Sequence, residues 1–397
     1  MNRRIAVVGG GLVGATLALA LDRAGLSPVV VEPRPPVPGA ESEDPRTVAL
    51  SPASIALLTG LGVWGSGDAA VPGICAYDAM EVWDADGTGR VRFEASELGV
   101  PSLGTITPNG HLLARLWARL EDRGVECVTD AGVVRFERDA RGARLTLEDG
   151  RRIEAALVAA ADGGRSRVRE LAAISAQVNS MGQLAVATTA AVERPHEDTA
   201  WQRFLATGPL AFLPLPDDDV GRHRVSVVWS LDEAEAVAIR ELDDASFAAA
   251  LERAFEGRLG RVLGVAPRGS FPLLQVHAER YVAERLVLVG DAAHVVHPLA
   301  GQGVNLGLKD VAVLVEVLDG IARGPAGARL GDAALLGRYE RARRGDNALA
   351  LGAMDGLKRL FGADDPGLRL LRNTGLAWVD RLAPVKRAFA EHALGLA

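Results

Sequence analysis

The sequence predicts an α/β fold in which a Rossmann-like domain carries an inserted α+β domain and is followed by a helical C-terminal region. An apolar run at residues 5–8, an Ala- and Leu-rich stretch at 12–24 and a second apolar run at 28–32 form a βαβ pattern. Strand-like runs alternate with turn clusters between Gln183 and Trp229. Past Gly301 the chain has helical periodicity almost throughout.

Shorter signals predict the elements between these regions. A helix is expected over 52–62, because a proline starts it and a glycine ends it. Hairpins are expected over 80–93 and 143–157, each turning at an Asp- and Gly-containing segment. The remaining expected elements are a strand over 156–161 and helices over 111–123, 244–255, 304–321, 333–361 and 366–394.

These elements divide the chain into six stretches. We expect the first domain to comprise residues 1–75, 99–180 and 275–325. The inserted domain would comprise a hairpin at 76–98 and residues 181–274. The helical region would occupy residues 326–397.

Composition limits the classes of function. The formal charge of −7 and the absence of a long basic run argue against nucleic acid as a partner. Cys75 and Cys127 are too few for a disulfide framework, which favours a reducing cytoplasm. No apolar run approaches the ~18 residues that span a bilayer, so we expect a soluble protein or one bound only at a membrane surface.

The first motif that predicts chemistry is Gly9-x-Gly11-x-x-Gly14, followed by Glu32 at the end of the second strand. Glycines let the backbone approach a pyrophosphate, whose negative charge the helix N-terminus stabilises. An acidic residue after the second strand accepts hydrogen bonds from ribose hydroxyls. In this context the motif indicates an adenine dinucleotide.

Two further motifs follow predicted strands. Asp162-Gly163 is either a turn stabilised by its Asp side chain or part of a site, and the residues alone leave both readings open. Gly290-Asp291 ends the strand before the Gly-rich start of a helix, where bare backbone amides would face a ligand. His294 and His297 lack a nearby carboxylate or cysteine set, so we expect no metal.

Together these motifs resemble the three fingerprints of the FAD-dependent aromatic hydroxylases with the para-hydroxybenzoate hydroxylase fold, the class A flavoprotein monooxygenases. Residues 297–307, His-Pro-Leu-Ala-Gly-Gln-Gly-Val-Asn-Leu-Gly, resemble the signature of the ubiquinone-biosynthesis hydroxylases within that class. Further similarities lie at 44–46, 49–51, 61–64, 109 and 339–343, so the likeness covers nearly the whole chain.

The resemblance implies a site for FAD, with NAD(P)H as a transient reductant. The first glycines and Glu32 would hold its ADP part, and Asp291 would bind the ribityl hydroxyls. The implied cofactor-binding residues are Gly9, Gly11, Gly14, Glu32, Arg46, Asn109, Asp162, Gly290, Asp291, Pro298, Gly301, Gly303, Val304 and Asn305. The sequence does not identify a catalytic acid or base. The residues implied to line the flavin ring are Pro298, Gly301, Gln302 and Gly303.

The implied reaction is hydroxylation of an aromatic ring with dioxygen through a flavin C4a-hydroperoxide. A polyprenylated ubiquinone precursor is the expected substrate, lying between the flavin and the inserted sheet. Candidate linings of its pocket are Gln183, Trp201, Phe204, Leu213, Pro214 and Trp229. The segment from Leu376 to Phe389 would either rest on a membrane or cap the domain.

Two alternatives remain open from the sequence. The chain could hydroxylate a small soluble phenol, although residues 302–307 favour the quinone branch. It could also be a catalytically silent flavoprotein that partners other quinone-biosynthesis enzymes. The ring carbon, the choice between NADH and NADPH, the prenyl length and the oligomeric state are not specified by the sequence.

Overall fold

The computed structural model describes residues 3–40, 43–65, 70–85, 89–296, 302–324 and 329–361. Its first sheet has six strands in the order β19-β20-β12-β1-β2-β8, and its central strands are parallel. The strand bounds are β1 Arg4–Val8, β2 Ser27–Glu32, β8 Glu126–Thr129, β12 Leu157–Ala160, β19 Val282–Ala283 and β20 Leu286–Leu288.

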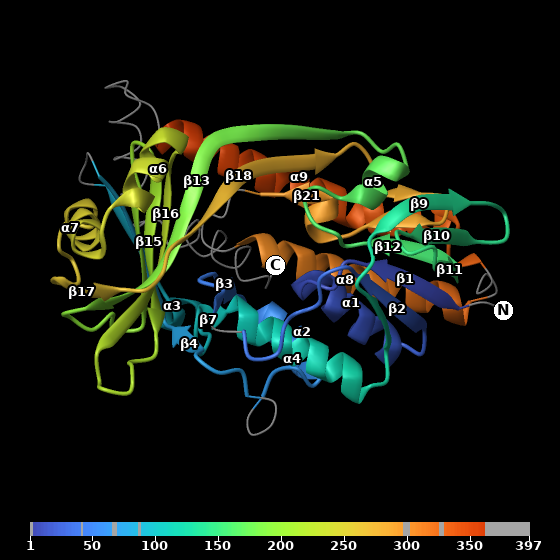
Figure 1. Ribbon diagram of the computed structural model, residues 1–397, viewed down its shortest axis with the longest axis horizontal. Helices are drawn as coiled ribbons and strands as arrows, with labels where there is room; N and C mark the ends of the chain where they lie inside the picture. The colour runs from blue at the N-terminus through green and yellow to red at the C-terminus, as the bar shows by residue number, and fades with distance from the viewer. Residues whose placement is uncertain are drawn as a thin grey trace.

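Helices α1 (Leu12–Arg23), α4 (Asn109–Asp122) and α8 (Gln302–Arg323) form a layer against this sheet (Figure 1). The small sheet β9 (Val133–Arg138), β10 (Ala143–Leu147) and β11 (Arg152–Ala155) contributes to the same core. With both faces covered, the parallel strands are apolar throughout rather than alternating. The predicted βαβ unit and the hairpin near 143–157 are confirmed.

The second large sheet has nine strands, and helices α6 (Glu233–Glu241) and α7 (Asp244–Ala254) lie on its outer side (Figure 1). Strand β13 runs from this sheet toward the first one along the top of Figure 1. The strands are β5 Ala79–Asp84, β6 Arg90–Glu94, β13 Ala176–Val192, β14 Thr199–Leu205, β15 Gly208–Leu215, β16 His223–Asp232, β17 Val262–Val265, β18 Gly269–Ala278 and β21 His294–Val295.

The predicted strands, the hairpin near 80–93 and helix α7 are confirmed in this sheet. Strand β13 begins at Ala176, earlier than the sequence indicated, because its exposed first half pairs with β18 outside the compact core. Helix α6 was not predicted. Its Glu233 and Glu235 stabilise the first turn by facing the positive end of the helix dipole.

A third sheet, β3 (Thr47–Leu50), β7 (Gly104–Pro108) and β4 (Cys75–Tyr77), lies between the two larger ones, next to α2 (Pro52–Gly60) and α3 (Ala95–Leu98). Helix α5 (Arg167–Leu171) follows β12, and α9 (Ala333–Phe361) packs on α8. The predicted helix over 366–394 lies outside the described residues. The predicted division of the chain into six stretches stays a prediction.

Among the described residues, no helix is both long and apolar enough to cross a bilayer.

A buried carboxylate joins the elements around the end of β20. Asp310 on α8 accepts hydrogen bonds from the Gly290 amide (3.0 Å), His294 Nε2 (2.6 Å) and Arg343 Nε on α9 (2.7 Å). Burial raises the pKa of Asp310, but His294 and Arg343 outweigh burial and leave the pKa below its usual value. The network fixes the turn after β20 against both helices.

We predict that Asp310→Asn lowers the free energy of unfolding by about 3 kcal/mol or more, because Arg343 then remains buried with its main counter-charge removed. Chemical denaturation measures this loss. Asp319→Asn, on the same helix, is the control, since Asp319 pairs with the exposed Arg323 and such pairs contribute about 0.5 kcal/mol. Equal stability of the two variants would contradict the role given to Asp310.

Candidate functional site

The loop between β1 and α1 has the geometry of a pyrophosphate-binding turn. Gly9 has φ +102°, and a Cβ there would lie 2.3 Å from the Ala161 carbonyl oxygen. A Cβ at Gly14 would lie 1.9 Å from the Gly9 carbonyl oxygen, whereas one at Gly11 would meet nothing within 4 Å. Gly9 and Gly14 therefore permit close packing, and Gly11 presents bare backbone to open space at the start of α1.

Glu32 lies at the end of β2 and reaches this loop. Its Oε2 accepts the Gly10 amide at 2.7 Å, and its Oε1 accepts the Arg34 amide at 2.9 Å. Trp117 of α4 donates from Nε1 to the Gly10 carbonyl oxygen at 2.8 Å, so both polar groups of Gly10 are held. The carboxylate is thus fixed beside the loop, where lone pairs remain for ribose hydroxyls.

The second motif contacts the first and the third. Asp162 follows Ala161, against which Gly9 packs. Asp162 Oδ2 accepts the Val168 amide at 3.1 Å at the start of α5, while its buried Oδ1 has no hydrogen-bond partner among the described residues. Burial raises the pKa of this carboxyl. The turn reading of the motif is therefore realised, and Oδ1 keeps an acceptor that no described residue uses.

Buried Arg169 connects the second motif to the third. Its Nη1 donates to the Ala292 carbonyl oxygen at 2.8 Å and its Nη2 to the Gly164 carbonyl oxygen at 2.9 Å. The three motifs, separated by more than a hundred residues in sequence, thus surround one region at the carboxyl ends of β1, β12 and β20. Ligands bind at this edge of parallel sheets.

The third motif forms the short 3₁₀ turn η3 (Gly290–Ala292). Gly290 adopts φ +58° and packs on Val13 of α1, so a larger residue would be strained there. Asp291 faces a cavity and is accessible through it, although protein surrounds the side chain and burial raises its pKa. None of the described residues donates a hydrogen bond to its carboxylate. The group is suited to accept hydroxyls from a ligand.

A cavity of about 380 Å³ separates this turn from the nine-stranded sheet. Its lining on the side of the first sheet includes Asp291, Val295, Val296, Gly303 and Val304. On the opposite side small residues of the sheet face it, and those residues are Ala185, Ala187, Ala200, Pro209, Ala211 and Ser230. Short side chains here leave space for a flat ring.

Arg46 and Asn109 come together at one end of the cavity through Asp44. Arg46 donates to Asp44 from Nε at 2.8 Å and from Nη2 at 2.7 Å, and Asn109 Nδ2 donates at 2.6 Å. Burial raises the pKa of Asp44, yet these donors outweigh it and lower the pKa overall. Both predicted residues line the cavity, so they are positioned to meet a ligand that enters it.

Asn305 acts through its side chain on the protein rather than facing the cavity. Its Oδ1 accepts the Ser51 amide at 2.9 Å and the Ser54 hydroxyl at 2.7 Å, and its Nδ2 donates to the Ala49 carbonyl oxygen at 2.8 Å. These bonds fix the start of α8 against β3 and α2. Pro298 and Gly301 lie outside the described residues, as does the side chain of Gln302.

Two of the residues predicted to line a substrate pocket, Trp201 and Leu213, line the cavity. Trp229 instead packs in the core beneath α7, and Phe204 packs with Val82 and Val91. Neither Gln183 nor Pro214 belongs to the described lining. Trp229 and Pro214 each adjoin a lining residue on their strand and so point to the opposite face of the sheet, whereas Gln183 and Phe204 share the face of the lining residues Ala185 and Gln202 but lie beyond the cavity. Core packing, the alternative that the sequence left open for these positions, holds for Trp229 and Phe204.

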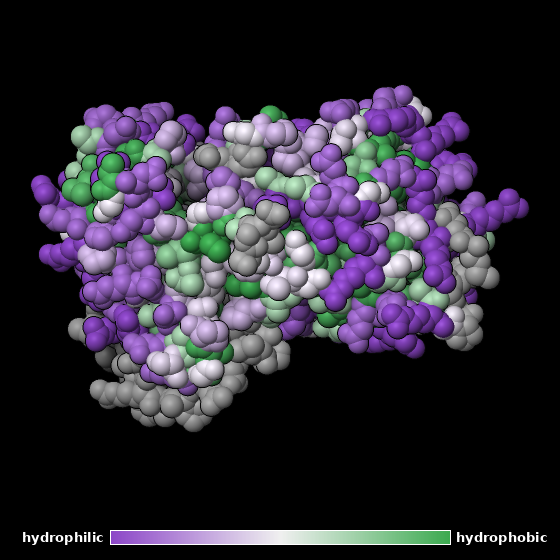
Figure 2. Space-filling view, turned by 90° about the horizontal axis from the view of Figure 1, so that it is seen from below, coloured by the Kyte–Doolittle hydropathy of each residue, from purple (hydrophilic) through white to green (hydrophobic). Residues whose placement is uncertain are grey.

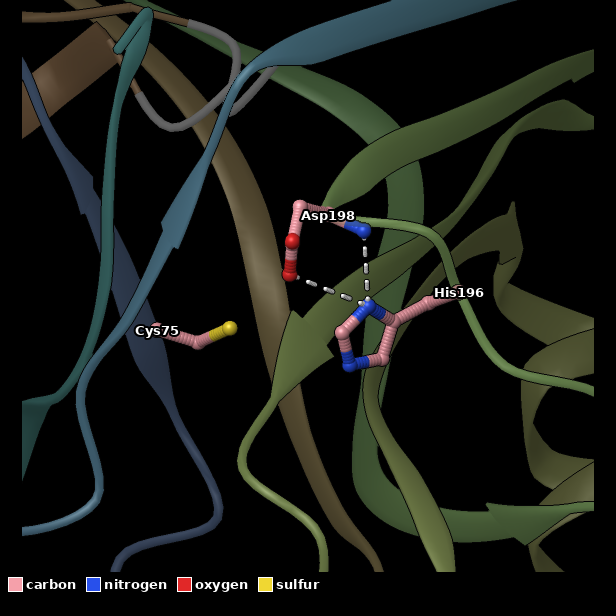
Figure 3. Close-up of side chains that lie close together, drawn as sticks. All are labelled: Cys75, His196 and Asp198. Carbon is pink, nitrogen blue, oxygen red and sulfur yellow. Dashed lines mark hydrogen bonds and ion pairs between the residues drawn. The ribbon is translucent and has the colours of Figure 1, made fainter. Parts of the chain in front are cut away.

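One group among the described residues has metal-ligating side chains close together, and it consists of Cys75, His196 and Asp198 (Figure 3). Both ring nitrogens of His196 are used, since Nδ1 accepts the Asp198 amide at 3.1 Å and Nε2 donates to the Leu215 carbonyl oxygen at 3.0 Å. Burial, with nearby acidic groups, raises the pKa of Cys75 to about 11. The group therefore offers neither a free imidazole nitrogen nor a thiolate at neutral pH.

Several residues that shape the site were not predicted from sequence. Asp44, Trp117, Arg169 and Asp310 all act by hydrogen bonds to distant segments. Only Asp310 had a local signal. It occupies the buried face of α8, four residues from Leu306 and from Leu314, and a charge there requires a buried partner.

Comparison with known proteins agrees with this geometry. The family model described as FAD binding domain matches residues 3–348. The chain is 38% identical to 3-demethoxyubiquinol 3-hydroxylase of Escherichia coli (strain K12), over 99% of this chain and 98% of the relative. It is 39% identical to ubiquinone hydroxylase UbiL of Rhodospirillum rubrum, over 98% of this chain and 89% of the relative.

Solved structures share the fold at lower identity. PqsL of Pseudomonas aeruginosa, described as a probable FAD-dependent monooxygenase, superposes with a TM-score of 0.75 at 24% identity, covering 94% of this chain and 99% of that one. For p-nitrophenol 4-monooxygenase PnpA of Pseudomonas putida the TM-score is 0.74 at 21% identity, covering 98% of each chain. The predicted α/β architecture is confirmed. The chain belongs to the FAD binding domain family, among the FAD-dependent hydroxylases, and FAD is its cofactor.

Proposed function

We propose that this protein hydroxylates the aromatic ring of a polyprenylated ubiquinone precursor, using FAD, NAD(P)H and dioxygen. The observation that carries the proposal is the cavity shared by Asp291, the start of α8 and the small-residue face of the nine-stranded sheet. A ring held against that sheet would lie beside the cofactor. The two relatives named as ubiquinone hydroxylases support the choice of ring.

The residues present fit FAD. Glu32 would hold the ribose of its ADP part, and the open Gly11 backbone would face the pyrophosphate. Asp291 would accept ribityl hydroxyls, and Arg46 with Asn109 would meet the phosphate and ribityl region. Gly303, Val304 and the Asn305 backbone at the start of α8 would lie beside the flavin ring.

The role of this chain is mainly positioning and electrostatics. When bound, FAD supplies the redox chemistry, taking electrons from NAD(P)H and activating dioxygen. The N-terminal end of α8 stabilises negative charge on a nearby ligand. The apolar and small side chains around the cavity hold the ring and exclude water.

A further part of the proposal concerns the place where the protein binds its substrate. A polyprenyl tail partitions into a bilayer, so we propose transient contact with the inner membrane and with other quinone-biosynthesis enzymes. The segment from Leu376 to Phe389, expected either to rest on a membrane or to cap the domain, lies outside the described residues. On the face shown in Figure 2, the described apolar side chains form separate patches among hydrophilic ones.

The direct test uses purified protein under ¹⁸O-labelled dioxygen. We expect a flavin spectrum, NAD(P)H oxidation that depends on a prenylated phenol, and one labelled oxygen atom in the product. Faster turnover of a small unprenylated phenol would favour the soluble-phenol alternative. Bound flavin without label in any phenol would leave a silent flavoprotein, and absence of flavin would refute every oxidoreductase interpretation.

Asp291→Ala should weaken FAD retention about tenfold or more, because it removes a charged hydrogen-bond acceptor. Folding should not suffer, since no described residue donates to this carboxylate. A carboxyl whose pKa is raised on folding destabilises the folded state as pH rises through its titration range. We therefore expect the apoprotein to melt at the same or a higher temperature at neutral pH, and a lower melting temperature with full FAD content would contradict the assignment.

Gly11→Val and Gly14→Val should fail in different ways. A side chain at Gly11 enters open space, so that variant should fold and lose FAD. A side chain at Gly14 overlaps the Gly9 carbonyl, so that variant should lose stability even as apoprotein. Circular dichroism melting and flavin absorbance of both variants separate the two effects. FAD retained by Gly11→Val would place the pyrophosphate elsewhere.

A further inference from the structure

Gln202 is a polar side chain in an otherwise apolar row across the cavity wall. On the nine-stranded sheet it pairs with Val82 of β5 and Ala211 of β15. The row continues through Val228 of β16 to Ala187 of β13. Ala187, Ala211, Val228 and Gln202 all line the cavity. The carboxamide thus lies in the wall opposite Asp291 and the start of α8.

The carboxamide of Gln202 has no hydrogen-bond partner among the described residues, although the residue is only 7% exposed. Its neighbour Arg203 points to the other side of the sheet, where it donates to Glu256 of the α7 region at 2.6 Å. Gln183 on β13 differs, since its Nε2 donates to the Thr207 carbonyl oxygen, although its Oε1 has no partner among the described residues. The carboxamide of Gln202 therefore opens only to the cavity, where a ligand can pair with it.

Tyr77 of β4 adds a second unpartnered polar group to the cavity lining. Its hydroxyl makes no hydrogen bond to a described residue. Burial raises the pKa of Tyr77 to about 12, so the phenol stays protonated and can donate. Two sides of the cavity therefore offer neutral hydrogen-bonding groups.

The charges around the cavity indicate which ligand these groups recognise. Arg46, the cation of the described lining, is already paired with Asp44. Asp291 contributes negative charge. A carboxylate on the ring would thus find no free cation among the described lining residues, whereas a neutral ring with hydroxyl or methoxy oxygens matches an amide that can both donate and accept.

We infer that Gln202 is a specificity-determining residue that hydrogen bonds an oxygen substituent of the neutral substrate ring, with Tyr77 as a second donor. This inference rests on the proposed function, because it takes the aromatic ring as the occupant of the cavity. To that function it adds the Gln202 carboxamide as the group that distinguishes one substituted ring from another. A site built to bond an oxygen rejects the analogue that lacks it, because its own polar group is then left unpaired.

The test compares two ring probes on the FAD-loaded enzyme, a short-chain prenylated methoxyphenol and the same compound without the methoxy oxygen. The wild type should prefer the first in kcat/KM. In Gln202→Leu the KM for the methoxyphenol should rise about tenfold, the preference should shrink toward one, and FAD content and melting temperature should stay unchanged. Gln177→Leu, on the exposed part of β13, is the matched control and should behave as wild type.

Gln202→Glu is a second variant of nearly the same shape. It keeps acceptors but loses the N–H donor, so it should also raise the KM for the methoxy probe. The inference would be overturned if folded Gln202→Leu or Gln202→Glu kept the wild-type KM and the wild-type preference for the methoxy probe. In that case turnover by the wild type would still leave the proposed function intact. Failure of the wild type to bind or turn over either ring would overturn the proposed function and the inference with it.

Discussion

The site depends on one buried ionic interaction, the carboxylate of Asp310 held between His294 and Arg343. Asp310 also receives the Gly290 amide, so the turn that carries Asp291 is fixed to α8 and, through Arg343, to α9. Removing two charges from water is expensive and is offset only when each is fully paired. The network satisfies this condition, and it keeps the Asp291 carboxylate directed toward the cavity.

Close backbone packing brings the other parts of the site to this turn. Gly9 allows contact with Ala161, and Gly307 lets α8 approach Val13 of α1. The pyrophosphate loop, the Asp162 turn and the η3 turn therefore meet at one sheet edge, with Arg169 connecting the last two. A second sheet with small residues on its inner face then closes the cavity. One domain fixes the cofactor, and the other shapes the space for the ring.

Much of this arrangement could be predicted from the sequence. The βαβ unit follows from the 5–32 pattern, since glycines and apolar periodicity are local signals with a physical cause. Family likeness extended the prediction to FAD and to a quinone ring. The likeness also implied cofactor contacts at Arg46 and Asn109, which stay a prediction, and it assigned no role to the Asp44 carboxylate that joins them.

The sequence could not predict side-chain environments that depend on strand register or on partners distant in the chain. Trp229 and Gln202 lie on strands of one sheet, yet Trp229 packs toward α7 and Gln202 lines the cavity. Successive side chains of a strand point to opposite faces of the sheet. The face that a given residue occupies therefore depends on where the preceding turn ends and the strand begins. Nothing near Gln202 in sequence distinguishes it from a solvent-exposed glutamine. Only the positions of the neighbouring strands show that its carboxamide lines the cavity without a hydrogen-bond partner among the described residues.

The central claim is that FAD binds with its ribityl chain on Asp291 and its ring in the cavity shared by the two sheets. A crystal structure of the FAD-loaded protein tests this most directly. The account predicts a ribityl hydroxyl within hydrogen-bond distance of the Asp291 carboxylate and the ring between Val304 and the Ala187 face of the sheet. A flavin bound outside this cavity, or an Asp291 side chain turned away from it, would contradict the account.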